Sequence, residues 1–215
     1  MINSTVSRSL LALFLSATLT YCNQPEQEQE QEQETPAAQE NHVGHNMQPS
    51  EGANIIGVQA EPDTLKGSLK AEAHGMIGDA HLTIAYYSPA VRGRQIWGGL
   101  VAYNQVWVTG AHAATSIMTD KDITIGGKEL PAGKYALFTI PGEQEWTIII
   151  NKNWEQHLAD DYTDTEDVLR FTVKPEVAPT KQERLRYEII SGDGGEGSIQ
   201  ITWDMLRVTL PVSQR

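Results

Sequence analysis

The chain has 215 residues, and its 28 acidic and 16 basic residues give a formal net charge of −12. With no basic stripe to neutralise phosphates, nucleic-acid binding is disfavoured. A single cysteine excludes a disulfide framework and a thiolate metal site, so the fold must be held together by an apolar core.

The N-terminus has the pattern of a lipoprotein signal peptide, residues 1–21. A single positive charge, Arg8, precedes an apolar run that is about half as long as a membrane-spanning helix. The sequence Leu-Thr-Tyr-Cys then follows, which is typical of a bacterial lipobox, and Cys22 is the residue that becomes lipidated. Tyr21 replaces the small residue usual before the cysteine, which leaves an ordinary secreted form as the alternative. We therefore expect an extracytoplasmic lipoprotein, anchored to a membrane (the outer membrane is favoured) through Cys22.

Residues 22–60 are predicted to be an acidic, disordered tether. The segment has seven glutamates and no lysine or arginine, and much of it is an alternating Gln-Glu run. Such a sequence cannot bury apolar surface and repels itself. The remaining residues, 61–215, are enough for one domain with its own core.

Alternating apolar and polar residues between turn-forming residues predict strands throughout this domain. Gly126-Gly127 predicts a two-residue hairpin turn between two of them, because glycine accepts positive φ angles. The run Ile148-Ile149-Ile150 lacks alternation and is expected to be covered on both faces. Only 154–163 has a helical pattern. In chain order, we expect strands near 69–75, 81–84, 106–109, 114–119, 122–125, 128–130, 134–140, 146–151, 168–173, 184–190, 198–203 and 207–210.

About ten strands and one short helix predict an all-β fold, an antiparallel β-sandwich, with a closed β-barrel as the competing arrangement. The first predicted hairpin turns at Gly78-Asp79. If residues 77 and 80 pair, His74 and His81 lie diagonally on the solvent face, about 7 Å apart or less at Cβ. Two exposed histidines are the simpler interpretation, and a weak surface metal site is the alternative.

Several ordered blocks of this domain closely resemble the uncharacterised DUF2911 family, which is common in Bacteroidetes. The resemblance covers roughly residues 69–211 and implies no established activity. The blocks that carry it are SPAVRGR (88–94), IWGGLV (96–101), VWVTGAH (106–112), TIGGK (124–128), LPAGKY (130–135), FTIPG (138–142) and WTIIINK (146–152).

This chain departs from the family pattern at two charged positions. Many members have Trp-Arg-Thr-Gly-Ala-Asn-Glu-Ala-Thr where residues 107–115 stand here, so Val108 and Ala113 replace an arginine and a glutamate. Chemistry that depends on those two charges cannot be transferred to this protein.

The first group of candidate ligand-binding residues follows a predicted strand. Arg92 and Arg94 flank Gly93, and two guanidinium groups can converge on a carboxylate, sulfate or phosphate. The alternative is a pair of turn arginines that bond backbone carbonyls or neighbouring acids. Trp97 and Trp107 can stack on a sugar or a planar ligand beside an arginine, or they can fill the core.

The histidines supply the second group. His112 follows Gly110-Ala111 at a turn and is the best single candidate for a titrating or metal-binding group, although one imidazole is not a site. On a helical turn, His157, Asp160 and Asp161 would point in one direction. Such spacing suits a divalent metal with His112 as a fourth ligand. A solvated acidic face is the simpler interpretation, and the sequence requires no cofactor.

The leading functional hypothesis is a non-enzymatic module that binds an anionic, glycan or protein ligand through Arg92, Arg94, Trp97, Trp107 and His112. A metal-dependent or histidine-based hydrolase centred on His112 is one alternative. The sequence contains none of the hydrolase, zinc-protease or dinucleotide-loop motifs that would support an enzyme. A purely structural component of an envelope complex is the other, for which we expect an exposed apolar patch.

Overall fold

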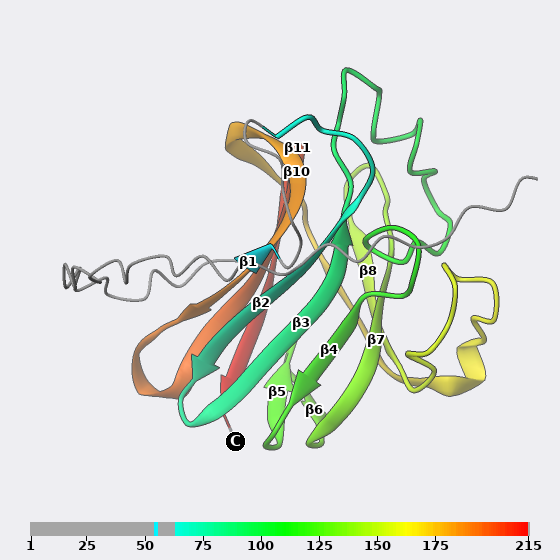
Figure 1. Ribbon diagram of the computed structural model, residues 1–215. Coiled ribbons are helices and arrows are strands. Elements are labelled where there is room, and N and C mark those ends of the chain that lie inside the picture. Colours follow the sequence, from blue (N-terminus) through cyan, green and yellow to red (C-terminus); the bar gives the residue numbers. More distant parts are fainter. Residues whose placement is uncertain (1–53, 56–62, 215) are drawn as a thin grey trace, which may run out of the picture. The chain divides into compact units, whose positions relative to one another are not determined.

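The computed structural model describes residues 54–55 and 63–214 (Figure 1). The predicted signal peptide, Cys22 and most of the predicted tether lie outside the described residues. Within residues 54–55 and 63–214, no helix is both long enough and apolar enough to span a membrane.

Two antiparallel sheets form the domain. The larger one has seven strands in the order β1-β2-β3-β4-β7-β8-β9, and the smaller one has four in the order β10-β11-β5-β6. Both sheets are open, so the predicted sandwich is confirmed and the closed barrel is wrong. The strands are β1 (Asn54–Ile55), β2 (Leu69–Ile77), β3 (Ala80–Ser88), β4 (Ser116–Thr119), β5 (Ile123–Ile125), β6 (Lys128–Leu130), β7 (Gly133–Ile140), β8 (Trp146–Asn151), β9 (Asp167–Val173), β10 (Glu176–Ser191) and β11 (Glu196–Gln214).

The two predicted hairpins have the expected register. Ile77 pairs with Ala80 in the β2–β3 hairpin, and Ile125 pairs with Lys128 in the β5–β6 hairpin. Gly126 and Gly127 have φ angles of 57° and 75°, the left-handed values that a two-residue turn of this kind requires. The pairing of β1 with β2 adds Asn54–Ile55, which belongs to the predicted tether range, to the edge of the larger sheet.

Three predicted elements differ in the structure. The segment 106–109 is not a strand: Trp107 forms only an isolated bridge with Thr139, and Thr109 then turns the chain with a φ of 52°. The predicted helix at 154–163 is also wrong, because Leu158 has a φ of 49° and its N–H donates to the His112 carbonyl at 2.8 Å. The two predicted C-terminal strands are one, β11. The short helices described are the 3-10 turns η1 (Asp164–Glu166) and η2 (Asp193–Gly195).

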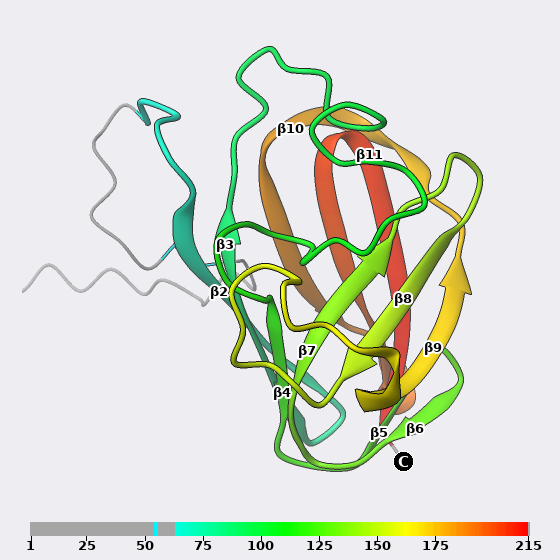
Figure 2. The ribbon, with the colours of Figure 1, turned by 90° about the vertical axis from the view of Figure 1, so that its right-hand side faces the viewer.

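The main core lies between the two sheets and includes the buried residues Trp146, Tyr187 and Trp203. A second, smaller apolar cluster lies on the outer face of β7 and β8. There Phe138 and Ile149 pack under Val108 and Ala114 from one loop and beside Trp154 from another. Figure 2 shows both loops crossing in front of β7.

An ion pair between buried Arg184 and partly exposed Asp63 fixes the chain that enters β2. The Arg184 side chain, only 8% exposed, donates to both carboxylate oxygens of Asp63, at 2.5 and 2.8 Å, and to the Ser88 carbonyl at 2.9 Å. The hydrogen bonds from Arg184 lower the pKa of Asp63 from 3.8 to about 2. Because the folded-state pKa is depressed, ionised Asp63 stabilises the fold fully above pH 3.8 and loses that contribution as the pH falls to about 2.

We predict that Asp63→Asn lowers the free energy of unfolding at pH 7 by about 1 to 2 kcal/mol, since Arg184 loses its charged partner and part of the pair is solvent-screened. Urea unfolding at pH 7 and at pH 3 measures the effect, and the difference between variant and wild type should shrink at pH 3. As the control, Asp79→Asn removes the exposed pair with Lys121 and should cost under about 0.5 kcal/mol. Equal costs for the two variants would contradict a structural role for the Asp63–Arg184 pair.

Candidate functional site

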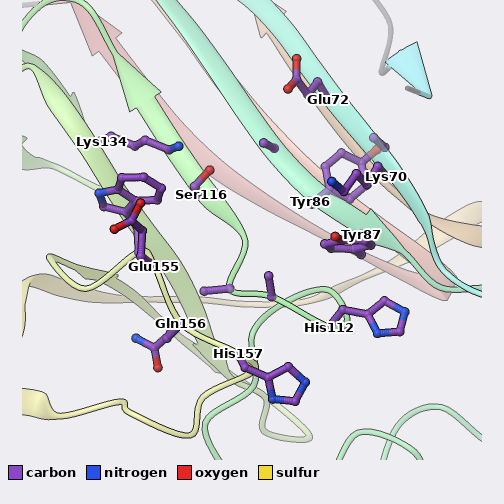
Figure 3. Close-up of a pocket in the computed structure, with 15 residues that line it drawn as sticks. Lys70, Glu72, Tyr86, Tyr87, His112, Ser116, Lys134, Glu155, Gln156 and His157 are labelled. Carbon is purple, nitrogen blue, oxygen red and sulfur yellow. The ribbon is translucent and has the colours of Figure 1, made fainter. Parts of the chain in front are cut away.

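An open groove of about 790 Å³ lies on the outer face of the seven-stranded sheet (Figure 3). Its floor is formed by small side chains, because Ala85 of β3 pairs with Ser116 of β4 at this point. Lys70 and Glu72 of β2 border the floor on one side, and Lys134 of β7 borders it on the other. Strand alternation puts all of these side chains on the outer face.

Two loops far apart in sequence form the remaining wall. Ala113 and His157 make an antiparallel bridge, the Ala114 N–H donates to the Gln156 carbonyl at 3.0 Å, and the Leu158 N–H donates to the His112 carbonyl. These bonds hold 112–114 against 154–157. Both His112 and His157 therefore line the groove, and both side chains are solvent-exposed.

The groove combines aromatic rings with charges of both signs. The Lys134 ammonium lies 3.6 Å from the centre of the Trp154 ring, and the Lys70 ammonium lies 5.8 Å from that of Tyr87. The Tyr87 ring also packs against His112 in an edge-on arrangement at 5.0 Å. The charged residues that line the groove, besides the histidines, are Lys70, Lys134, Glu72 and Glu155, so their formal charges cancel.

Of the five predicted ligand-binding residues, the structure places only His112 at this groove. The Arg94 guanidinium donates to the carbonyls of Ala90, at 2.6 Å, and Val91, at 3.1 Å. Arg92 is exposed, with a φ of 52°, and its backbone N–H donates to Glu183 at 2.6 Å. The Arg94 guanidinium is therefore held by backbone carbonyls of its own turn.

Trp97 and Trp107 contact each other at 5.9 Å between ring centres and pack against the core. Trp107 also stacks on buried Trp203 at 5.8 Å, and Trp97 meets buried Trp146 at 4.9 Å. The Trp107 indole N–H donates to the Gly110 carbonyl at 3.2 Å. Both rings are half-buried, and these contacts are those of a cluster that closes one end of the sandwich.

The structure brings together part of the predicted metal set. His157 Nδ1 lies 2.9 Å from a carboxylate oxygen of Asp160, and His112 is on the adjacent loop. Asp161 is exposed. In the part of the chain that the structure describes, no group of three or more His, Cys, Asp or Glu residues is placed to hold a metal ion.

Sequence reasoning missed most residues of the groove. Tyr87, Lys70 and Glu72 occupy solvent-facing positions of ordinary strands, and such positions carry no sequence signal for a site. Trp154 was placed in a predicted helix. Tyr87 differs from an ordinary solvent-facing strand residue because it is half-buried against His112. That contact joins residues far apart in the sequence, so a local pattern does not predict it.

The fold and the groove define an all-β sandwich domain with an open cleft on its larger sheet. Residues 68–212 match the family model described as "Protein of unknown function (DUF2911)". The match covers more than half of the chain, so this protein belongs to the DUF2911 family. Comparison with the curated proteins and comparison with the solved structures each found no match.

We predict that Trp107→Ala lowers the free energy of unfolding by about 3 kcal/mol, because it opens a cavity beside Trp203 and Trp97. Urea unfolding followed by tryptophan fluorescence measures the loss. Arg92→Ala, a truncation of an exposed side chain, should change stability by no more than about 0.5 kcal/mol. A Trp107→Ala variant as stable as wild type would point instead to a ligand platform.

Proposed function

We propose that this protein is a non-enzymatic ligand-binding module and that the groove beside Tyr87 is its binding site. The observation that carries the proposal is the groove itself, whose volume of about 790 Å³ lies within the range typical of small-molecule sites. Its floor is a rigid sheet, and its wall is fixed by backbone hydrogen bonds between two loops. Such a site is formed before the ligand arrives, which lowers the entropic cost of binding.

The lining favours a polar, uncharged ligand with an apolar face, and a saccharide fits this chemistry. The formal charges of the two lysines and two glutamates cancel, so the groove does not select strongly for an anion or a cation. The half-buried Tyr87 ring offers an apolar surface, while the neighbouring charged side chains can bond hydroxyl groups. Small residues on the floor leave room for a ring to lie flat.

We predict that Tyr87→Ala weakens saccharide binding at least tenfold, since it removes the aromatic surface while leaving the strand intact. A panel of oligosaccharides screened by array and then measured by isothermal titration calorimetry provides the readout. The matched control is Met205→Ala, a truncation at an exposed β11 position of the smaller sheet, and it should bind as wild type does. If Arg92→Ala abolishes binding and Tyr87→Ala does not, the ligand binds at the arginine turn and the groove is not the site.

The same proposal places the domain on a membrane through Cys22, on a tether formed by the acidic segment. The support is the lipobox pattern and the Gln-Glu run of the sequence. Acyl chains supply the anchor in this proposal, because a formal net charge of −12 opposes electrostatic binding to anionic lipids.

We predict that the expressed full-length protein incorporates an alkyne-tagged palmitate and fractionates with membranes. Cys22→Ser should abolish labelling and release the protein into the soluble fraction. Ser4→Ala, within the same signal segment, is the control and should change neither result. An unlabelled wild-type protein would contradict lipidation and favour the ordinary secreted form.

A second candidate function is a hydrolase that uses a histidine as general base. Asp160 can orient His157 through the 2.9 Å contact, which leaves Nε2 free to accept a proton at the groove. Both side chains are more than 60% exposed, so water competes at this position. Turnover of ester or glycoside substrates that disappears in His157→Gln would favour this function over simple binding, and absence of turnover would remove it.

A further inference from the structure

A second cluster of chemically distinctive side chains lies on the larger sheet, outside the groove. It consists of His74 and Met76 on β2, His81 on β3 and Met118 on β4, which we call the His–Met patch. Both methionines are conspicuously exposed, at 42% and 41%. Their thioether sulfurs are therefore accessible from solvent, as that of Met205 on the smaller sheet is.

Strand register places the four side chains on one face and close together. Met76 pairs directly with His81, and Thr83 pairs with both His74 and Met118, so His74 and Met118 are each diagonal to His81. Direct neighbours are about 5 Å apart at Cβ and diagonal ones about 7 Å. The two imidazole rings are stacked, with centres 5.9 Å apart and planes within 15°.

The environment of His74 is that of a metal-binding imidazole. Its Nε2 lies 3.0 Å from the Glu72 carboxylate, which accepts a hydrogen bond from this nitrogen in the tautomer that carries the proton there. The other nitrogen, Nδ1, then holds a lone pair and accepts the Thr83 hydroxyl at 3.2 Å. A carboxylate that fixes the tautomer of a histidine in this way is the usual outer partner of a metal ligand. Within residues 63–214, the one hydrogen bond of Nδ1 that a metal there would replace is that with the Thr83 hydroxyl.

The donor set selects a class of metal. Two imidazoles and two thioethers fall short of the three or four nitrogen, oxygen or thiolate ligands usual for zinc, and the described residues contain no group of three or more His, Cys, Asp or Glu residues placed to hold a metal ion. Thioether sulfur instead favours soft monovalent ions. We propose that the His–Met patch binds Cu(I), with His74 Nδ1 and the His81 imidazole as nitrogen donors and a methionine sulfur completing the site.

Forming this site requires one ring to turn, because imidazole lone pairs lie in the ring plane and the two planes are within 15° of parallel. Metal–nitrogen bonds are about 2 Å long, so the two donor nitrogens must come within about 4 Å of each other. The ring centres are 5.9 Å apart and both histidines are half-buried, so rotation about the His81 side-chain torsions is the movement that would bring its donor nitrogen toward His74 Nδ1. Both methionines are unbranched and free to turn their sulfur inward.

Anaerobic competition with the chromogenic chelator bicinchoninate tests the proposal on the full chain, in a His42→Ala/His45→Ala background that removes two histidines of the N-terminal segment. We expect one equivalent of Cu(I) per chain. His74→Ala/His81→Ala should weaken Cu(I) binding at least tenfold, and Met76→Leu/Met118→Leu at least threefold. Met205→Leu removes another exposed thioether, on the smaller sheet, and should leave the affinity unchanged.

Any of three results would overturn the proposal. One is the lack of a stoichiometric Cu(I) equivalent in the background protein. Another is an affinity that the double histidine variant does not alter, while its circular dichroism melting curve shows that it is folded. Equal weakening by Met205→Leu and by Met76→Leu/Met118→Leu would equally reject a defined site, since it would mean that exposed thioethers bind Cu(I) wherever they lie.

Discussion

The groove depends on a contrast between the two halves of one sheet face. At β7 and β8 the outer face is apolar, with Ala136, Phe138 and Ile149 fully buried, and it must be covered. At β2 and β3 the same face carries lysine, glutamate, histidine and threonine and can remain in water. The loops around 106–114 and 152–163 cover the apolar half and end over β4. The groove lies at the boundary between the covered half and the open half of this face.

A few backbone hydrogen bonds fix the two loops that form the wall of the groove. The bonds between His112 and Leu158 and between Ala114 and Gln156 join the two covering loops edge to edge. Two residues with positive φ, His112 at 63° and Leu158 at 49°, turn the chain there. Non-glycine residues in this conformation carry strain, which the surrounding packing must offset. The wall of the groove is one of several places in the described residues where non-glycine residues have positive φ.

Local patterns predicted the sheets well, and they failed where the structure depends on long-range contacts. The alternation of 81–84 and the Gly126-Gly127 turn specify strands and a hairpin without reference to the rest of the chain. The unbroken Ile148–Ile150 run correctly indicated a strand covered on both faces, since Ile149 belongs to the outer cluster and its neighbours to the core. The loop at 154–163 has a helical pattern, but its apolar residues instead follow the surface of β7 and β8. That surface is formed by other segments of the chain, so the pattern of residues 154–163 alone does not reveal it.

The same dependence on long-range contacts explains where the structure places the candidate site residues. Arginines and tryptophans are candidates because these residue types bind ligands well. In a turn, however, an arginine can donate to nearby backbone carbonyls, as Arg94 does. Tryptophans near one another in sequence can meet in a core, as Trp97 and Trp107 do. The groove is instead formed by ordinary strand residues and by two loops that carry His112 and His157, and the relative position of these histidines depends on a bridge between distant segments.

Amide-resolved NMR is the most direct test of the claim that this groove is the binding site. Isotope-labelled protein is titrated with the saccharides that bind, and the shift of each backbone amide is followed. The account predicts that the largest changes fall on the outer-face residues of β2 to β4 and on residues 112–114 and 154–157. Changes centred on residues 92–97, or spread evenly over both sheets, would contradict it.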